Sequence, residues 1–244
     1  DVLVANNVFN HSDDPLSFIE GARVMIKTGG TIVFEVPYWK STIDSKKIDQ
    51  VYHEHVSYFT ATSVKECIDK FNFEVINIDV VDYHGGSLRV YAKKMSPDAK
   101  VNHTKKLTQL MEEENYLFNV TTYEALQKDL DIRKVEFLNK IISYKMKGVP
   151  VIGIGAAAKG NTLLNYLNLD DTIIDWVTDI SEHKRNKFTP LSNIPICGDD
   201  VVTNYDELCA VILSWNLSEV IKSKLRELNP NIQFINFYEE RNEK

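Results

Sequence analysis

The sequence has few cysteines and no long hydrophobic run. Its three cysteines, Cys67, Cys197 and Cys209, lie far apart among 244 residues and form no CxxC pair. This usage argues against a disulfide framework and favours buried thiols in a reducing, cytoplasmic compartment. No apolar stretch approaches the roughly 18 residues that a membrane-spanning helix needs, and no basic-then-apolar leader opens the chain, so we expect no membrane partner.

Basic residues are also in deficit. The chain has 28 Lys plus Arg against 35 Asp plus Glu, a formal net charge of −7. This balance argues against general nucleic-acid binding and leaves room for a local phosphate site. The hydrophobic share of 43% and the charged share of 26% are ordinary for a globular protein of one large or two small domains. Because Asp1 opens the chain in a strand-like run without a methionine, we expect a fragment of a longer polypeptide.

Short apolar runs alternate with helix-like segments, which predicts an α/β fold with a parallel sheet. We expect strands over residues 2–8, 31–36, 74–81, 87–93, 149–154, 173–177, 210–214 and 232–235. Asp14 and Pro15 indicate a helix start, as does the apparent capping box of Ser63 and Glu66. Residues 101–147 have almost no glycine or proline and predict two helices that meet near Asn119.

Four polar side chains, Tyr52, His53, Glu54 and His55, follow one another directly. If this segment is extended, Tyr52 and Glu54 point to one side and the two histidines to the other. An imidazole suits proton abstraction near neutral pH, and a neighbouring carboxylate can fix its tautomer. A metal site that includes His84 and a plain polar loop are the alternatives.

Polar residues also follow the first predicted strand and a later glycine pair. Asn6, Asn7 and His11 lie at the carboxyl end of the strand, the edge where open α/β sheets bind ligands. They are candidates for cofactor or substrate contacts, or they shape the turn. His84 precedes Gly85 and Gly86, which predicts a hairpin tip with a candidate substrate contact.

A glycine-rich loop begins the second half of the chain. Gly153, Gly155 and Ala158 follow a predicted strand and open a helix, in the spacing of a dinucleotide-binding loop. Lys159 adds a cation beside the helix start. Candidate phosphate contacts are therefore Gly155, Lys159, Gly160 and Asn161, with Asp179 at the end of the next strand in the position of a ribose-binding acid. A tight turn without a ligand is the alternative.

Taken in order, the motifs NNVFNH, FEVP, YHEHVSYF, HGGSLRVYA, GIGAAAKGNTLLNY and LSWNLSEVI resemble those of the sugar C-methyltransferases of deoxysugar biosynthesis. The resemblance covers essentially the whole chain. It implies S-adenosylmethionine as cofactor and a nucleotide-linked 4-keto-deoxysugar as substrate. A base removes the C3 proton beside the ketone, and the resulting enolate attacks the sulfonium methyl group.

The resemblance also implies roles for the residues singled out above. His55 is the expected base, with His11 as its rival. Glu54 is expected to orient or polarise neighbouring groups, and Tyr52 to donate to the enolate oxygen. The family's zinc belongs to a cysteine-rich N-terminal domain that this sequence does not contain, so no metal is expected among these residues.

The same resemblance implies a domain organisation. Residues 1–97 are expected to be the C-terminal half of a class I methyltransferase domain that lacks its own cofactor loop. Residues 98–147 are expected to be a helical connector, and residues 148–244 a Rossmann-like C-terminal domain. Two other functions remain open: a nicotinamide-dependent oxidoreductase that uses Gly153 and Asp179, and a non-catalytic module that binds a sugar nucleotide.

Overall fold

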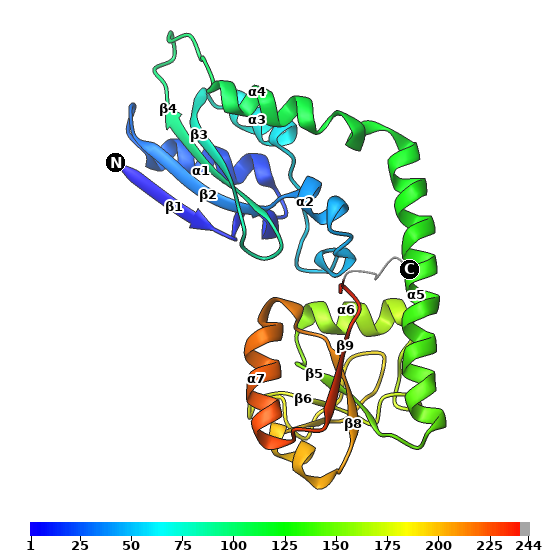
Figure 1. Cartoon of the computed structure of the whole chain (residues 1–244). Helices are drawn as coiled ribbons and strands as arrows, with labels where there is room; N and C mark the ends of the chain where they lie inside the picture. The colour runs from blue at the N-terminus through cyan, green and yellow to red at the C-terminus, as the bar shows by residue number, and fades with distance from the viewer. Residues whose placement is uncertain (240–244) are drawn as a thin grey trace. The chain divides into compact units, whose positions relative to one another are not determined.

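The computed structural model describes residues 1–239 and divides into two compact units (Figure 1). The first unit comprises Asp1–Lys47 and His53–Leu126. The second comprises Ile48–Tyr52 and the chain from Gln127 onward. A five-residue segment inside the first half of the sequence therefore belongs to the second unit. Within residues 1–239, no helix combines the length and the apolar character needed to cross a membrane.

A four-stranded sheet forms the centre of the first unit. Its strands are β1 (Val2–Asn6), β2 (Thr31–Pro37), β3 (Phe73–Val81) and β4 (Ser87–Lys94), in the order β1-β2-β4-β3. β1 and β2 are parallel, whereas β4 is antiparallel to both β2 and β3. The predicted strands are confirmed within two residues at each end, and the α/β fold class is confirmed.

Short polar side chains cap two of the helices of this unit. They are α1 (Pro15–Met25), α2 (Trp39–Asp44), α3 (Ala61–Asp69) and α4 (Lys105–Glu113), with 3₁₀ turns η1 (Phe9–His11) and η3 (Asn115–Phe118). Asp14 caps α1 as predicted, since its carboxylate accepts from the backbone N–H groups of Leu16 and Ser17.

The predicted start of α3 at Ser63 is wrong by three residues. Thr60 is the N-cap: its hydroxyl accepts from the N–H of Ser63, and the Ser63 hydroxyl accepts from the N–H of Thr60. A serine hydroxyl thus does what a glutamate does in the usual capping box. The predicted box of Ser63 and Glu66 therefore lies inside the helix.

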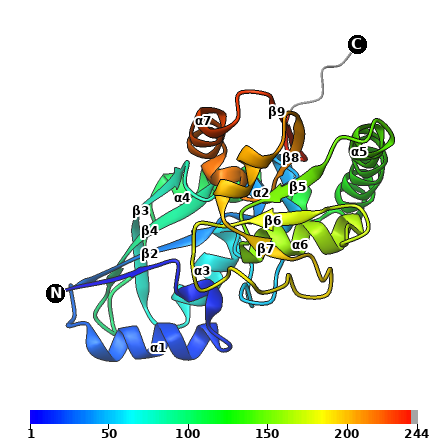
Figure 2. The same cartoon turned by 90° about the horizontal axis from the view of Figure 1, so that it is seen from below.

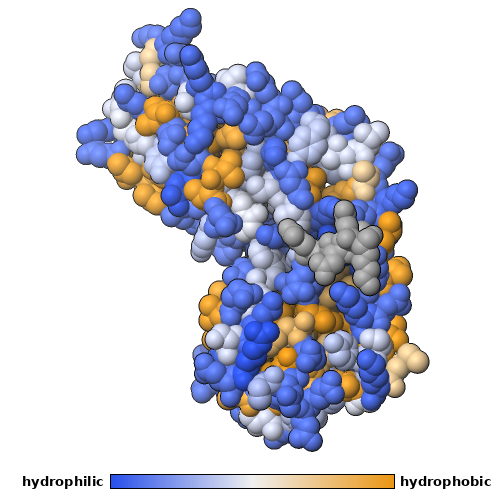
Figure 3. Space-filling model, viewed as in Figure 1, coloured by the Kyte–Doolittle hydropathy of each residue, from blue (hydrophilic) through white to orange (hydrophobic). Residues whose placement is uncertain are grey.

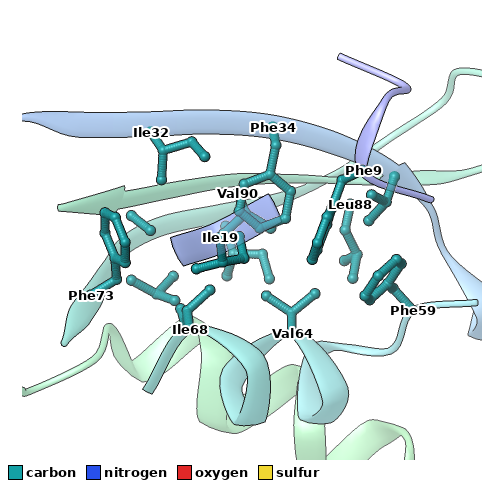
Figure 4. Close-up of a cluster of buried hydrophobic side chains, with 14 of the residues drawn as sticks. Phe9, Ile19, Ile32, Phe34, Phe59, Val64, Ile68, Phe73, Leu88 and Val90 are labelled. Carbon is teal, nitrogen blue, oxygen red and sulfur yellow. The ribbon is translucent and has the colours of Figure 1, made fainter. Parts of the chain in front are cut away.

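The core of the first unit lies between the sheet and α1 and α3. Figure 4 shows Ile32 and Phe34 of the sheet pointing toward Val64 and Ile68 of α3, and all four are fully buried. Ile19 of α1 completes this contact. The sequence predicts that Phe18, Ala22, Met25 and Ile26 form one apolar face of α1. Ala22 and Ile26 are buried as predicted, whereas Met25 is exposed and Ile19 is buried in addition.

Phe9 joins this core to the segment that follows β1. Its ring lies 5.2 Å from that of Phe18, 5.3 Å from Phe34 and 4.5 Å from Phe59, measured between centroids. Phe9 is completely buried. Aromatic pairs at this spacing add stabilisation beyond the area they bury. The 3₁₀ turn that ends in His11 is therefore anchored by its first residue.

A buried carboxylate reaches α3 from a distant part of the chain. Glu114, which follows α4, accepts hydrogen bonds from the N–H groups of Ala61 and Thr62, at 2.5 and 3.1 Å, and from the Thr62 hydroxyl at 2.9 Å. These donors are in the first turn of α3, where a negative charge is favourable. Burial and the nearby Glu114 carboxylate raise the pKa of Tyr38 well above its ordinary value.

A single long helix, α5 (Val120–Met146), continues from the first unit into the second. The Asn119 side chain accepts from the N–H of Thr121 at its start. Its buried residues are Leu130, Phe137 and Ile141, spaced seven and four residues apart. The sequence predicts a buried stripe of Leu126, Val135, Leu138, Ile141 and Ile142. Ile141 is buried as predicted, whereas Val135 and Ile142 are exposed.

The second unit contains an all-parallel sheet of five strands. They are β5 (Val151–Ile154), β6 (Trp176–Thr178), β7 (Ile196–Cys197), β8 (Leu208–Ile212) and β9 (Ile232–Asn236), in the order β7-β6-β5-β8-β9. The two-residue strand β7 is too short for a periodicity to reveal it. The predicted Rossmann-like sheet is confirmed.

Helices α6 (Ala158–Leu167) and α7 (Ser218–Leu228) cover opposite faces of this sheet (Figure 2). The 3₁₀ turns η4 (Asp199–Asn204) and η5 (Trp215–Leu217) lie next to β8 and α7 in sequence. The chain runs from β5 to β6 in one direction and from β8 to β9 in the other. Right-handed crossovers then place the two helices on opposite faces and open a crevice between β5 and β8.

The segment Ile48–Tyr52, which contains the 3₁₀ turn η2 (Ile48–Gln50), is held in the second unit by Asp49. The Asp49 carboxylate accepts from Trp215 Nε1 at 2.5 Å, and its backbone N–H donates to the Tyr238 hydroxyl at 3.2 Å. Burial raises the pKa of the Asp49 carboxyl, although the bonds from Trp215 and Tyr238 and the charge of Lys159 act in the opposite direction.

Glu114→Ala is expected to destabilise the protein by about 1–3 kcal/mol, because two N–H groups of α3 and the Thr62 hydroxyl lose their acceptor. Glu114→Gln keeps one side-chain oxygen and is expected to lose less. Urea denaturation followed by circular dichroism measures both. The matched control is Glu112→Ala, at an exposed position of α4 two residues before Glu114. Equal losses for Glu112→Ala and Glu114→Ala would contradict this capping role.

Asp49→Asn is expected to gain stability relative to the parent protein as the pH rises. Because the folded pKa of Asp49 is raised above the ordinary 3.8, folding favours its protonated form, and the parent loses stability as the pH rises through this range. The amide keeps an oxygen for Trp215 and carries no charge. Urea denaturation at pH 4.5 and at pH 7 tests this, with exposed Asp98→Asn as the control. A difference that shrinks toward pH 7 contradicts it.

Candidate functional site

Two of the predicted site histidines come together beyond the carboxyl end of β1. The backbone carbonyl of Asn10 accepts from the N–H groups of Val56 and Ser57, at 3.0 and 3.2 Å. These bonds tie the loop after residue 51 to η1. As a result, the rings of His11 and His55 meet edge to face, with centroids 5.1 Å apart and planes at 73°.

The two histidines differ in their exposure. His55 is buried, with 8% of its surface exposed, whereas His11 is exposed. The ring of Tyr58 lies 6.5 Å from that of His55, on the same loop. A buried imidazole beside a second, accessible one can take up a proton in a site sheltered from water. This arrangement suits a general base.

The remaining residues of the Tyr52–His55 run do not form the extended segment that the alternation of faces requires. His53 and Glu54 form a turn, and both are exposed. Glu54 Oε1 lies 4.0 Å from His53 Nε2. Tyr52 is half-buried and belongs to the second unit, whereas His53 returns to the first. The condition for the alternation of faces, an extended segment, is therefore not met, because His53 and Glu54 form a turn.

Asparagine side chains lie at the same edge of the sheet. Asn6 ends β1 and is exposed, and Asn7 has a positive φ of 52° and donates its N–H to the Glu35 carbonyl. In the described chain, the buried Asn7 Oδ1 and both amide atoms of Asn10 have no hydrogen-bond partner. Buried polar atoms without partners are uncommon and point to a ligand or an ordered water. Sequence reasoning alone does not select Asn10, since an asparagine after a strand is equally typical of a turn.

A buried glutamate near the carboxyl end of β2 forms an ion pair with a partly exposed arginine. Glu35 Oε1 accepts from Arg89 Nε at 3.0 Å and from Arg89 Nη2 at 2.9 Å. The two residues are register partners of β2 and β4. The hydrogen bonds from Arg89 to Glu35 raise the pKa of the guanidinium. Only the strand register, which pairs opposite charges directly, could have revealed this pair beforehand.

His84 lies at the tip of the hairpin between β3 and β4, with φ at 50°, as the glycine pair predicts. Its ring packs on Tyr83 at 4.1 Å. Gly86 has a φ of 111°, and a Cβ there would lie 2.4 Å from the Cβ of Ser41 in α2. The close approach of α2 therefore accounts for Gly86 without a ligand.

The glycines of the second-unit loop also have packing reasons. Gly155 has a φ of 92°, and a Cβ there would lie 2.1 Å from Ser214 Oγ. A Cβ on Gly160 would lie 2.8 Å from the Cβ of Leu213, so α6 packs closely on the residue after β8. Close packing within the second unit therefore accounts for both glycines without a ligand.

The first turn of α6 has features that are typical of an anion-binding site. Within residues 1–239, its N-cap Ala157 supplies no side-chain cap. Lys159 is in the first turn, with its ammonium 5.6 Å from the centroid of the Trp215 ring. In the same part of the chain, the buried Asn161 Oδ1 has no hydrogen-bond partner. A helix N-terminus with an adjacent lysine favours phosphate.

The Asp179 carboxylate already forms hydrogen bonds and an ion pair within the second unit. Its Oδ2 accepts from the N–H of Ala156 at 2.9 Å and pairs with Lys184 at 3.0 Å, and its Oδ1 accepts from the N–H of Ser181 at 2.8 Å. These bonds occupy the carboxylate that a ribose would need. The arrangement therefore does not favour the nicotinamide-dependent oxidoreductase.

Among residues 1–239, no group of three or more His, Cys, Asp and Glu side chains is placed to bind a metal ion.

Comparison with known proteins gives matches over both units. Residues 1–78 match a family described as a methyltransferase domain, and residues 82–236 match one described as a C-methyltransferase C-terminal domain. The chain is 25% identical over 237 residues to C-methyltransferase NovU of Streptomyces niveus. The alignment covers 96% of this chain and 56% of NovU, so the chain spans about half the length of that relative.

The second family match covers more than half of the chain and includes the hairpin strand β4, the whole of α5 and the parallel sheet of the second unit. The first match covers β1, η1 and the loop that carries His55. With both matches in this order, the chain belongs to the C-methyltransferase family.

Proposed function

We propose that the chain is the part of a C-methyltransferase that deprotonates and holds its substrate, a nucleotide-linked 4-keto-deoxysugar, for methylation at C3. The observation that carries this proposal is the buried ring of His55 against His11 beyond the carboxyl end of β1. A 4-keto group makes the C3 proton removable. The site then needs a base, a donor for the developing oxyanion and exclusion of water.

His55 is the proposed base. Its burial shelters the imidazole, and the carbonyl of Asn10 fixes the two residues that follow it. His55 takes the proton from C3, and the electron pair of that C–H bond forms the enolate with the 4-keto oxygen. Tyr52 is proposed to donate a hydrogen bond to that oxygen, and Glu54 to orient the groups around it. His11 is accessible and is the alternative base.

Asn6 and Asn7 are the proposed cofactor contacts. The buried Asn7 Oδ1 and the Asn10 amide, which have no partner among residues 1–239, fit a ligand with polar hydrogens at this edge of the sheet. S-adenosylmethionine, when bound, supplies the electrophilic methyl group that the enolate carbon takes. The chain's own contribution is to orient this ligand and to keep water out.

The second unit is proposed to hold the nucleotide end of the substrate through the loop of Gly155 and Gly160, with Lys159 and Asn161. The open start of α6 and the ammonium of Lys159 support a contact with the diphosphate. The N–H of Ala156 already donates to Asp179, so the contact is proposed for the first turn of α6. His84, at the hairpin tip, is the proposed contact for the sugar.

The proposed domain organisation follows the same division. Residues 1–97 are proposed as the C-terminal half of a class I methyltransferase domain, 98–147 as a connector and 148–244 as the C-terminal domain. Within residues 1–239, β1 is paired on one side only, and Val2 and Val4 are 66% and 63% exposed. Figure 3 shows hydrophobic surface over this strand. The unpaired edge of β1 could accept a further strand, and the exposed side chains of Val2 and Val4 leave one face of β1 open to cover by another element.

His55→Gln in the complete enzyme is expected to reduce methylation by at least 10²-fold, the usual minimum for loss of a general base. The same variant is expected to lose the exchange of the C3 hydrogen with deuterium from heavy water. Methyl transfer followed by mass spectrometry and exchange followed by NMR measure the two steps. The matched control is His53→Gln, an exposed histidine two positions away.

Normal exchange in His55→Gln, with exchange lost in His11→Gln, would assign the base to His11. Normal exchange in both variants would remove the imidazole pair from the proposal altogether. A nucleotide sugar that binds normally but undergoes neither exchange nor methylation in the unmodified complete enzyme would instead indicate the non-catalytic binding module.

Lys159→Ala is expected to weaken the binding of dTDP and UDP by about tenfold or more, because the diphosphate loses a charge-assisted contact. Affinity for S-adenosylmethionine is expected to stay unchanged. Isothermal titration of the complete enzyme measures both. Lys187→Ala, an exposed lysine of the same unit, is the control. Unchanged affinity for both diphosphates would support the tight-turn interpretation of the loop.

A further inference from the structure

The long helix α5 has a second apolar face, which residues 1–239 leave open to solvent. Four hydrophobic side chains form it, and their exposed fractions lie between 44% and 84%. They are Ile132, Val135, Ile142 and Met146. All four belong to the second unit, and Figures 1 and 2 show α5 along the edge of that unit. Contiguous apolar surface of this kind is typical of an interaction site.

The exposed face lies opposite the face of α5 that packs on its own unit. Leu130, Phe137 and Ile141 are buried, and the Phe137 ring contacts that of Phe237, with centroids 5.5 Å apart. At about 100° per residue, the four exposed residues point about half a turn away from the three buried ones. Apolar residues on two opposite faces are typical of a helix packed between two partners. Within residues 1–239, only the inner face is packed.

The exposed residues follow the heptad spacing of a coiled coil. Starting from Ile132, they are separated by three, seven and four residues. Ile132 and Met146 therefore take one type of core position, and Val135 and Ile142 take the other. The core position between Val135 and Ile142 is Asn139, which is also exposed. A single asparagine among apolar core residues is typical of coiled coils, where it selects the register at a cost in stability. The stripe therefore fits a partner helix.

The charges beside this stripe change sign along the helix. From residue 131 to residue 147, the carboxylates come first and the lysines last: Asp131 and Glu136, then Lys140, Lys145 and Lys147. The cations at positions 133 and 134 donate to backbone carbonyls of their own unit. If two copies of α5 pair antiparallel, the acidic part of each lies opposite the basic part of the other. Parallel pairing would place like charges together.

We propose that α5 pairs antiparallel with α5 of a second copy of this chain, through the stripe from Ile132 to Met146. A two-fold axis brings the same face of both copies together, and this stripe and its charges are complementary to themselves. The stripe is about 21 Å long, or two heptads. Because such an interface is small, we expect a dissociation constant in the micromolar range. The inference does not depend on the proposed function.

The test is the oligomeric state of the complete enzyme, measured by sedimentation velocity and light scattering across the micromolar range. We expect a dimer that dissociates on dilution. A monomer at every concentration overturns the inference, since another part of the complete chain then covers the stripe or the stripe stays open.

Three variants place the dimer contact on α5. Val135→Glu and Ile142→Glu put a charge into the stripe, and each is expected to raise the dissociation constant about tenfold or more. Asn139→Leu is expected to lower it, because an apolar side chain replaces a polar one in the core of the interface. This opposite change separates a contact at the stripe from damage to the fold. Val24→Glu, at an exposed position of α1, is the matched control and is expected to dimerise normally.

Circular dichroism checks that each variant folds. A dissociation constant that stays unchanged in both Val135→Glu and Ile142→Glu overturns the inference, because the dimer contact then lies elsewhere. An unchanged dissociation constant for Asn139→Leu contradicts a core position for this residue.

The orientation is tested by zero-length carbodiimide coupling in dimers mixed from isotope-labelled and unlabelled copies. We expect a link between Asp131 of one copy and Lys145 or Lys147 of the other. In a parallel pair these residues are about 21 Å or more apart along the helix axis, too far for a direct link. Links from Asp131 that reach only residues near position 131 of the other copy would overturn the antiparallel arrangement.

Discussion

The candidate site of the first unit depends on the attachment of one loop to the end of one strand. The carbonyl of Asn10 holds the N–H groups of Val56 and Ser57, and the buried ring of Phe9 stacks on Phe59 at the far end of the same loop. Phe9 and Asn10, which are neighbours in the sequence, thus connect the segment after His55 to the core and to the end of β1. This attachment brings the two histidines together although more than forty residues of sequence separate them.

In the second unit, loops are also attached by hydrogen bonds, but the acceptors are aspartate carboxylates and not a backbone carbonyl. The Asp49 carboxylate, accepting from Trp215, fastens the five residues before His53 to that unit, and Asp179 fastens the glycine-rich loop to the strand end beside it. In both places an aspartate carboxylate is used as an internal hydrogen-bond acceptor. For Asp179, this use leaves no free carboxylate for a ribose in a loop that has the spacing of a dinucleotide site.

The fold could be predicted well because its signals are local. Apolar runs, the cap at Asp14 and the glycine pair before β4 gave the strands and most helices, and family resemblance supplied the C-methyltransferase assignment that the comparisons confirm. The misses concern which of several similar residues takes a role. Thr60 rather than Ser63 is the N-cap of α3, and the apolar residues Met25, Val135 and Ile142 are exposed, because residue type alone does not distinguish between neighbouring candidates for a cap or a buried face.

By itself, the sequence determined which side chains could do acid–base chemistry and on which strand ends they stand, because residue type and periodicity are properties of short segments. Only the tertiary structure decided that His11 meets His55, that Tyr52 belongs to the other unit and that Asp179 is already bonded. The physical reason is that such pairings are fixed by chain path and strand register. A hydrogen bond to a carbonyl far away in the sequence can change the position of a motif, and the sequence of the motif itself does not reveal this.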